Sequence, residues 1–423
     1  MRPPRALPRR PLAAVSCVVV LGGMLTAAGA TSAAIPPPRR MPMVHSAPQL
    51  KLHPSGSVTV SWRGNGHAHG MSQYGAQGAA LRGLSARQIL HFYYPHTRLI
   101  RTTPSTIRVR LTNISSTYTT VLAVGRGLAL SGYGVLPKAG YTKYRLLPWR
   151  DGLRLQGKHD GRWRSLSRDL GSRAEFHSAS HWVQLLDYDG TSTRYHGRVG
   201  AVRDGSREMT INRVDMNQYV AGSVAGEVPA SWRPAAVHAQ AIAARSFAEY
   251  LRSLAGRGSH YDICDTTMCQ SYVGMAHYDS AGNVLSTENV RAVRGNRNMV
   301  LRYHGGPVLA QYSASDGGAS VSGGLPYLVA KPDPYDSRES GDPYLDQSTS
   351  VSVASIASAY GLKKVTAVRI NSRDGIGPWK GRVVSAVVVG VDSSGHRRRV
   401  HTNGDQLGAA VGVWTDYLRL HTG

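Results

Sequence analysis

The amino-acid sequence predicts an α+β fold in which strands are grouped around a central helical segment that carries the candidate site. Residues 106–213 consist mostly of short alternating apolar and polar runs separated by turn signals, as at 107–111, so this part is β-rich. From residue 214 the apolar spacing becomes that of helices, and strand-like runs return at 299–303. These observations place a helical part between two parts that contain strands.

Short elements precede and follow these parts. A strand begins near Val58, and residues 63–70 form a turn too rich in glycine to be a regular element. Helical spacing follows at 72–81 and at 85–92, where Ser85 is the expected N-cap. The remaining expected elements are strands at 308–312, 365–370 and 383–391 and a helix at 353–360.

The central helical segment is predicted in two pieces. Asp215 is a good N-cap for the first piece, and Val220 and Val224 fall on one of its faces. The Gly-Glu-Val-Pro stretch at 226–229 then ends the helix, and Pro234 begins the second piece at a first-turn position that proline favours.

The second helix is expected to have two different faces. One face carries the stripe formed by Val237, Ala241, Ala244, Ala248 and Leu251. The other face carries His238, Arg245, Glu249 and Arg252. This pattern predicts a helix that packs against a core on one side and faces solvent or a cleft on the other.

The N-terminus has the layout of a secretory signal peptide at residues 1–34. Four arginines within the first ten residues precede a short apolar run, which ends in small residues. The run is too short and too rich in glycine for a permanent span, so we expect secretion without a transmembrane anchor. Residues 35–50 contain three consecutive prolines and are expected to form an extended linker.

The chain of 423 residues carries a formal net charge of +25. Removal of residues 1–34 lowers this charge to +21, because four arginines and no acids are lost. Such a charge predicts a polyanionic partner, and for an exported protein we expect the anionic polymers of a cell wall. Basic residues are scattered without an aromatic–basic motif, so we predict no nucleic-acid binding.

Two cysteines, Cys264 and Cys269, remain after removal of the signal peptide. In an exported protein such a pair is expected to form a disulfide. His260 lies four residues before the first cysteine, so the three side chains are an alternative set of zinc ligands with a fourth position open. Either arrangement clamps the same loop, and no other cofactor or metal is predicted.

Glu227 stands at the break between the two central helices. An acid beside glycine and proline near the start of a helix has a structural interpretation, because a carboxylate there interacts favourably with the helix dipole. The alternative interpretation is a catalytic carboxyl group, and the pattern of the surrounding residues alone does not decide between the two.

Four motifs in different parts of the chain give Glu227 a context. They are Gly-Glu-Val-Pro-Ala-Ser-Trp at 226–232 with Ala-Gln-Ala-Ile-Ala-Ala-Arg-Ser at 239–246, the cysteine-containing stretch at 262–274, Tyr-Ser-Ala-Ser-Asp-Gly-Gly at 312–318, and GNGHAHGMSQYGA at 64–76. Together they resemble the SpoIID/LytB family of bacterial cell-wall proteins. That family includes sporulation proteins that act as peptidoglycan lytic transglycosylases and proteins known as enhancers of wall amidases.

The resemblance implies a domain organisation. A segment at 51–105 carries the Gly/His motif, and a SpoIID/LytB-like domain occupies 106–423. Its parts are the β-rich region 106–213, the helical and motif-bearing core 214–343, and an α/β region at 344–423.

The resemblance also places the family's catalytic acid on Glu227 and its GHGxGMSQ motif on residues 66–73. Two positions depart from the family pattern, since Ala68 stands where glycine is usual and Asn65 where an aromatic residue is common. The motif also precedes the β-rich region here, whereas in the sporulation members it follows the acid. The two motifs must therefore meet in one cleft if both serve the site.

The implied reaction needs one carboxyl group. A lytic transglycosylase cleaves the bond between N-acetylmuramic acid and N-acetylglucosamine while the muramyl 6-hydroxyl group closes an anhydro ring. Glu227 would act first as acid and then as base, whereas hydrolytic glycosidases typically use two carboxylates. Burial near Val228 and Trp232 is expected to raise its pKa. The implied partners are peptidoglycan glycan strands or, for an enhancer, a wall amidase.

Further residues in the motifs are candidates for substrate binding. They are His67, Gln73, Gln240, Arg245, Ser246, Asp265, Thr267, Gln270, Tyr272 and Ser313. Each has a simpler structural interpretation beside the functional one: a solvated arginine at 245, local turn bonding around 265–267, a histidine that holds its own turn at 67, and a strand-end turn at 312–318.

Overall fold

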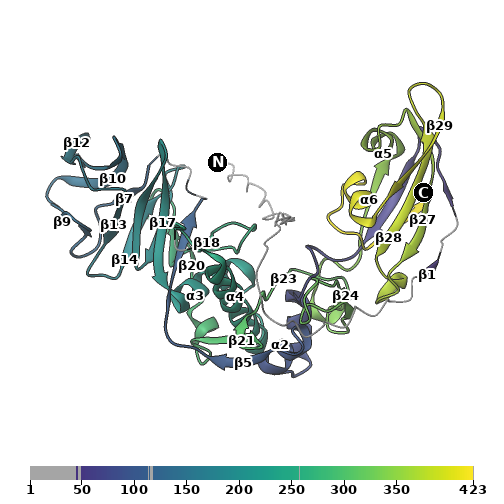
Figure 1. Ribbon diagram of the computed structural model, residues 1–423, viewed down its shortest axis with the longest axis horizontal. Helices are drawn as coiled ribbons and strands as arrows, with labels where there is room; N and C mark the ends of the chain where they lie inside the picture. The colour runs from purple at the N-terminus through teal and green to yellow at the C-terminus, as the bar shows by residue number, and fades with distance from the viewer. Residues whose placement is uncertain (1–43, 46–48, 113, 115–117, 257, 423) are drawn as a thin grey trace, which may run out of the picture.

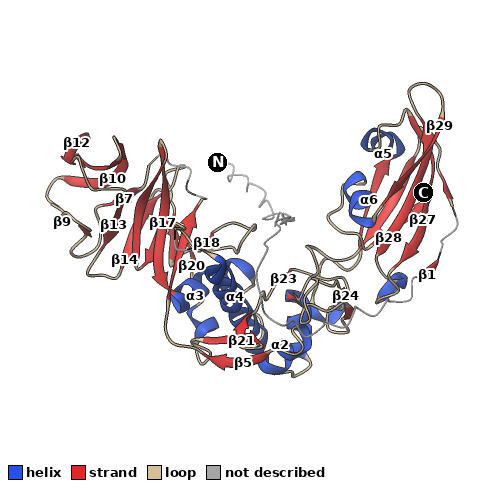
Figure 2. Ribbon diagram, viewed as in Figure 1, coloured by secondary structure: helices blue, strands red, loops and turns tan. Residues whose placement is uncertain are grey.

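The computed structural model describes residues 44–45, 49–112, 114, 118–256 and 258–422. Along its longest axis lie a β-rich part, a helical centre and a C-terminal part that combines strands with two short helices (Figures 1 and 2). The predicted α+β class is therefore confirmed. The expected signal peptide and most of the expected linker lie outside the described residues. Among the described residues, none of the helices has both the length and the apolar character to cross a bilayer.

The β-rich part consists of two sheets. The eight-stranded sheet has the order β12 (Arg162–Ser167), β11 (Gly152–His159), β10 (Tyr141–Trp149), β7 (Thr120–Leu122), β14 (Trp182–Leu186), β15 (Ser192–His196), β19 (Ala276–Tyr278) and β20 (Val284–Thr287). The seven-stranded sheet has the order β18 (Ile263–Cys264), β6 (Thr106–Leu111), β17 (Arg207–Asp215), β16 (Arg198–Asp204), β13 (Arg173–His177), β8 (Ala129–Leu130) and β9 (Gly134–Val135).

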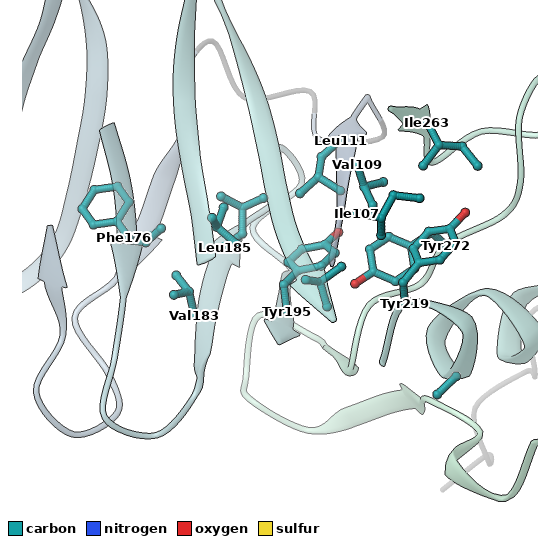
Figure 3. Close-up of a cluster of buried hydrophobic side chains, with 14 of the residues drawn as sticks. Ile107, Val109, Leu111, Phe176, Val183, Leu185, Tyr195, Tyr219, Ile263 and Tyr272 are labelled. Carbon is teal, nitrogen blue, oxygen red and sulfur yellow. The ribbon is translucent and has the colours of Figure 1, made fainter. Parts of the chain in front are cut away.

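A single apolar core joins these sheets to the helical centre. Phe176, Val183 and Leu185 contribute to it from the sheets, and Tyr219 contributes from the first central helix (Figure 3). The alternation of the strand sequences explains this arrangement, because every second side chain of a strand points to the same face. The core therefore fixes the helix that carries Glu227 against the β-rich part.

The two central helices are α3 (Met216–Glu227) and α4 (Pro234–Leu254). Asp215 caps α3 by accepting hydrogen bonds from two backbone N–H groups of its first turn, and Pro234 is the first residue of α4, both as predicted. The shorter helices α1 (Gln73–Leu81) and α2 (Ala86–Tyr93) pack against α4, and Ser85 caps α2 in a capping box. A small sheet of β22 (Gly306–Pro307), β21 (Met299–Tyr303) and β5 (Arg98–Arg101) also contacts α4.

The structure corrects the prediction that α4 turns its polar face toward solvent or a cleft. Arg245 is fully buried and Glu249 is 5% exposed, whereas His238 and Arg252 are half-buried, so the middle of this face lies in the interior rather than toward solvent or a cleft. Neighbouring elements cover α4 on several sides. Glu249 forms a salt bridge of 2.6 Å with Arg302 of β21.

The predicted strand at 308–312 is wrong for most of its length. Only Tyr312 and Ser313 form a strand, β23 (Tyr312–Ser313), whereas 308–311 has no regular structure. The alternation that suggested a strand has another origin, because Val308 and Ala310 are buried in the core of the helical centre. β23 pairs in parallel with β4 (Met71–Ser72), which directly precedes α1.

The C-terminal part has two sheets and two helices. One sheet has the order β26 (Gln347–Ser352), β3 (Ser57–Trp62) and β30 (Leu418–Thr422). The other has β1 (Val44–His45), β27 (Lys364–Arg373), β28 (Val383–Val391) and β29 (Arg397–Thr402), with β2 (Leu50–Lys51) also paired to β27. The helices are α5 (Val353–Ala359) and α6 (Gly404–Ala410). The remaining short elements are β24 (Ala319–Ser320), β25 (Lys331–Pro332) and the 3₁₀ helices η1 (Val290–Val293), η2 (Arg338–Ser340) and η3 (Pro378–Lys380).

Two segments from before the Gly/His motif join this C-terminal part. β3 pairs with β26 and β30 because Val58 and Val60 are buried in the C-terminal core. The end of the expected linker also differs from an extended connection, since β1 and β2 pair with β27. The segment 51–105 is thus divided between two parts of the molecule.

Candidate active site

Glu227 is the last residue of α3 and borders an open cleft. Val228 ends the helix in an extended conformation and Pro229 follows, so the glutamate lies where the chain turns away from the helix axis. The cleft has a volume of about 550 Å³. Its lining comes from residues 225–230 on one side and 287–291 on the other. The site therefore lies between the end of α3 and the segment that follows β20.

Three hydrogen-bond donors converge on the Glu227 carboxyl group. The backbone N–H of Ser271 donates to Oε1 at 2.9 Å, and Gln73 Nε2 donates to Oε2 at 3.2 Å. The hydroxyl group of Tyr312 also bonds to this carboxyl group. The residue as a whole is half-buried, and burial of its carboxyl group raises the pKa, while the three donors act in the opposite direction. The net shift is upward, which favours the protonated acid.

Gln73 is brought to Glu227 by the Gly/His motif. Ser72 caps α1 by accepting a hydrogen bond from the N–H of Gly75, which fixes Gln73 as the first residue of the helix. Gly70 allows the chain to arrive there. It has a φ of +72°, and a Cβ atom on it would lie 2.1 Å from the carbonyl oxygen of Gln311. The two motifs that the sequence separates by about 150 residues therefore meet in one site.

A buried polar network supports the site from behind. Gln270 Nε2 donates to the Tyr312 hydroxyl group at 2.9 Å and to the carbonyl oxygen of Ala244 at 3.1 Å. Its Oε1 accepts from the Tyr219 hydroxyl group at 2.8 Å. The chain of bonds connects α3, α4 and the loop after the cysteines, so it holds Tyr312 beside Glu227.

A second group of acids lies under the motif at 312–318. Asp336 Oδ2 accepts four hydrogen bonds, from Ser72 Oγ at 3.0 Å, Ser315 Oγ at 3.0 Å, Asp316 N at 2.8 Å and Gly317 N at 3.1 Å. Asp316 and Asp342 are also buried. Burial and the neighbouring carboxylates raise the pKa of Asp316 well above its usual range and that of Asp342 to about 8. Asp336 thereby ties the helix cap before Gln73 to the loop after Tyr312.

Four of the predicted substrate-binding side chains point into the protein. Arg245 donates to the carbonyl oxygen of Met299, and Ser246 Oγ accepts from the N–H of Leu301, so both attach β21 to α4. Asp265 accepts hydrogen bonds from Thr112, and the Tyr272 hydroxyl group donates to Asn212 Oδ1 at 2.8 Å. All four of these side chains are buried: Arg245, Ser246, Asp265 and Tyr272. The contacts described here attach structural elements to one another.

The other predicted binders have different settings. Gln73 and Gln270 belong to the site described above, while Ser313 Oγ accepts from the N–H of Ala68 and so holds the Gly/His turn. Thr267 is exposed between the two cysteines. Gln240 is 1% exposed, and neither polar atom of its side chain has a hydrogen-bond partner among the described residues.

His67 holds the turn of its own motif. Its Nδ1 accepts a hydrogen bond from the N–H of His69 at 2.9 Å. Burial, and to a lesser extent the neighbouring His69, lowers the pKa of His67 to about 4. The ring is therefore neutral at neutral pH, and in this state Nε2 carries the proton because Nδ1 is the acceptor.

Cys264 and Cys269 form a disulfide with a Cα–Cα distance of 5.5 Å. It closes the loop that precedes Gln270 and Ser271, two residues of the site network. Both sulfur atoms are used in this bond, so the zinc alternative with His260 would require reduction of the pair. Within the described ranges, His, Cys, Asp and Glu side chains form no group of three with the geometry of a metal site.

Three residues of the site are not among the candidates that the sequence predicts. Glu288 and Asn289 line the cleft opposite Glu227, and Asp336 supports it from the motif side. Glu288 Oε1 bonds to His196 Nε2 at 2.8 Å, whereas Asn289 Nδ2 is buried without a partner among the described residues. A Glu-Asn pair directly after a strand is a signal for the first two, but it is common in loops.

Comparison with known proteins identifies relatives of the region around this site. Residues 204–303 match the SpoIID family model, described as Stage II sporulation protein. The chain is 35% identical over 121 residues to the amidase enhancer of Bacillus subtilis (strain 168), which covers 27% of this chain and 15% of that protein. It is 30% identical over 146 residues to the Stage II sporulation protein D of Bacillus amyloliquefaciens, which covers 30% of this chain and 41% of that protein.

The corresponding protein of Bacillus subtilis (strain 168) gives a similar result, with 30% identity over 144 residues, 30% of this chain and 41% of that protein. The chain thus spans less than half the length of the curated relatives it matches. The family-model match includes α3, Glu227, α4 and the disulfide loop. Gln73 and Tyr312, which complete the site, lie outside it.

Proposed function

We propose that the chain, whose residues 204–303 match the SpoIID family model, is an exported, wall-associated lytic transglycosylase that cleaves peptidoglycan glycan strands. The observation that carries this proposal is Glu227, a residue that lines a cleft of about 550 Å³ and whose pKa is raised by burial of its carboxyl group. An acid that keeps its proton at a higher pH than a free glutamate is suited to protonate a glycosidic oxygen.

The reaction proceeds in the cleft with Glu227 as the only proton-transfer group. Its carboxyl group donates a proton to the glycosidic oxygen as the bond from that oxygen to C1 of N-acetylmuramic acid breaks. The 6-hydroxyl oxygen of the same sugar forms a new bond to C1, and its proton passes to the Glu227 carboxylate. Water is neither consumed nor released, and the glutamate ends in its starting protonation state.

The donors around Glu227 have a role in the second half of this cycle. Ser271 N–H, Gln73 Nε2 and the Tyr312 hydroxyl group stabilise the carboxylate that forms after proton donation. They also hold the group in one orientation, which reduces the loss of entropy on the way to the transition state. Asn289 Nδ2 at the cleft wall has no partner among the described residues and is suited to the acetamido carbonyl of a bound sugar.

The Glu227→Gln variant tests the proposal. The substitution keeps the shape of the side chain but removes the transferable proton, so we expect cleavage of isolated glycan strands to fall by about 10²–10⁴-fold. Mass spectrometry of the products measures the anhydro-muramyl ends. Glu339→Gln is the matched control, because Glu339 is an exposed glutamate paired with Arg82 on the surface. Wild-type activity in the Glu227→Gln variant, or reducing ends in the wild-type products, would contradict the proposal.

A second candidate function follows from the similarity to a protein named as an amidase enhancer. In this case the chain binds peptidoglycan and stimulates a separate wall amidase without cutting glycan itself. The two functions differ in what Glu227 does. If an added amidase releases stem peptides faster in the presence of this protein, and the Glu227→Gln variant stimulates it equally well, the enhancer function is supported.

A further inference from the structure

The outer face of the eight-stranded sheet carries a row of arginines stacked on aromatic rings. The guanidinium carbon of Arg145 lies 4.0 Å from the ring centroid of Trp163, and that of Arg194 lies 4.3 Å from Trp182 and 4.5 Å from Tyr278. The three stacked arginines are Arg145, Arg154 and Arg194, and Arg154 lies 4.5 Å from Trp149. We refer to these three arginines, together with Trp149, Trp163, Trp182 and Tyr278, as the arginine–aromatic row.

The register of the sheet shows that the row occupies one face. Arg145 pairs with Gln156 on β11, and Arg194 pairs with Gln184 on β14, and each arginine also donates a hydrogen bond to the glutamine beside it. Side chains of directly paired residues point to the same face of a sheet. The adjacent residues, such as Leu146 and Tyr195, point to the opposite face and are buried in the core.

The row continues into the cleft of Glu227. Arg194 pairs with Ala276, and Ala276 pairs with Thr287, which lines the cleft. On the same face, His196 bonds to Glu288, a second residue of the cleft wall. From β20 to β12 the sheet has seven inter-strand steps of about 4.8 Å, so this face extends roughly 34 Å away from the cleft. The β-rich part in Figure 1 shows the strands that make up this length.

The charge of the row is not compensated within the described structure. None of the three arginines forms a salt bridge with a described residue. Arg154 Nε is buried and has no hydrogen-bond partner among the described residues. Gln156 and Gln184 occupy the Nε groups of Arg145 and Arg194, and stacking holds the remaining N–H groups in a fixed plane in which they can donate to a carboxylate. Trp149, Trp163 and Trp182 are half-buried and offer apolar surface beside the cations, whereas Tyr278 is buried.

We propose that the arginine–aromatic row binds the part of a peptidoglycan strand that extends beyond the cleft, with the arginines on the carboxylates of its peptide stems and the rings against the apolar faces of its sugars. The identity of the polymer rests on the proposed function. The direction in which the row runs follows from the strand pairing of the sheet and does not depend on that function. A strand seated on it enters the cleft past Thr287 and reaches Glu227.

Binding to insoluble peptidoglycan sacculi tests this inference without cleavage. In the Glu227→Gln background, the triple variant Arg145→Gln, Arg154→Gln and Arg194→Gln is expected to bind sacculi at least about tenfold more weakly in co-sedimentation. The matched control replaces Arg87, Arg207 and Arg397, three exposed arginines on other elements, by glutamine, which removes the same charge. We expect the control to bind within about twofold of the parent.

Two further measurements identify the ligand groups. Conversion of the stem carboxylates of the sacculi to uncharged amides should weaken binding of the parent but have little effect on the triple variant, because the negative charges are lost while the sacculi stay cross-linked. With Glu227 intact, the triple variant should lose more activity on whole sacculi than on short glycan fragments that occupy only the cleft. The single variant Arg194→Gln, nearest the cleft, repeats the test if the triple variant does not fold.

The outcomes separate this inference from the proposed function. If the triple variant binds sacculi as the control does, the row does not bind the strand, whatever the catalytic result. If amidation of the stem carboxylates leaves binding unchanged, the assignment to carboxylates is wrong. If binding depends on the row but wild-type protein yields no anhydro ends, the inference stands and the transglycosylase proposal fails.

Discussion

Two acidic residues of the helical centre, half-buried Glu227 and buried Asp336, differ in what surrounds their carboxyl oxygen atoms. Glu227 shares three donors between its two oxygens and borders an open cleft. Asp336 receives four donors on one oxygen and lies among the buried acids Asp316 and Asp342. Burial alone therefore does not identify a reactive acid. Asp336 also lines a cleft, and its Oδ1 has no hydrogen-bond partner among the described residues. Of the two acids, Glu227 is the one that lies within the stretch matching the SpoIID family model.

The two sites are also connected. Asp336 binds the cap of the helix that begins with Gln73 and the loop that follows Tyr312, and these two side chains are two of the three donors to Glu227. Asp336 thus acts as a positioning residue for the site around Glu227. A substitution of Asp336 should therefore also affect the site around Glu227.

The largest expected effect comes from Asp336→Ala. Four buried donors lose their acceptor, and an unsatisfied buried donor costs about 1–3 kcal/mol, so we expect the free energy of unfolding to fall by roughly 3 kcal/mol or more. Glycan cleavage by the folded fraction should fall at least about tenfold, because the donors on both sides of Glu227 lose their support. Urea denaturation and product analysis measure the two effects.

Asp346→Ala is the control for this prediction. Asp346 is 49% exposed and pairs with Arg63 and Arg338 on the surface, so its loss should cost no more than about 1 kcal/mol and leave cleavage unaffected. Equal losses of stability in the two variants would show that the four donors do not depend on Asp336. If the Asp336→Ala protein is destabilised but cleaves glycan as fast as the wild type, Asp336 does not position the donors of Glu227.

A second prediction concerns the pH dependence of cleavage. The reaction starts with protonated Glu227, so activity should decline as the pH rises through the raised pKa of this group. The Tyr312 hydroxyl group favours the carboxylate and so lowers that pKa. Tyr312→Phe removes this donor, and we therefore expect the alkaline limit of activity to move to higher pH, together with a lower maximal rate.

The pH–rate profile of Tyr188→Phe provides the comparison, because Tyr188 is 75% exposed in the β-rich part. Its profile should coincide with that of the wild type. An alkaline limit that moves to lower pH in Tyr312→Phe would mean that a group other than Glu227 sets it. The experiment therefore tests which of the buried acids controls the rate.

Local signals in the sequence predict much of the fold. Asp215, Pro234 and Ser85 mark helix starts through interactions within a few residues, and the structure places all three helices there. Alternation likewise predicts the strands at 299–303 and 383–391, which the structure confirms as β21 and β28. These features depend on neighbours in the chain, which a single sequence shows.

Features that depend on distant contacts are predicted poorly. Arg245 has the spacing of a surface residue, but β21 covers its face of the helix and binds its guanidinium group. The contact of Gln73 with Glu227 spans 154 residues, and that of Ser72 with Asp336 spans 264. The family resemblance indicates the first contact because both motifs belong to it. Asp336 lies outside the quoted motifs, so its role becomes visible only in the folded chain.

The smallest expected effect sharpens the assignment of Glu227 against a neighbour in the same cleft. Glu288 is a second carboxyl group on the cleft wall, but its Oε1 bonds to His196 and its side chain is 11% exposed. Glu288→Gln should therefore reduce cleavage less than about tenfold, lower stability by about 1 kcal/mol, and leave anhydro-muramyl ends as the products. If instead it abolishes cleavage as Glu227→Gln does, and the wild-type products carry reducing ends, two carboxyl groups act together and the enzyme hydrolyses the glycan.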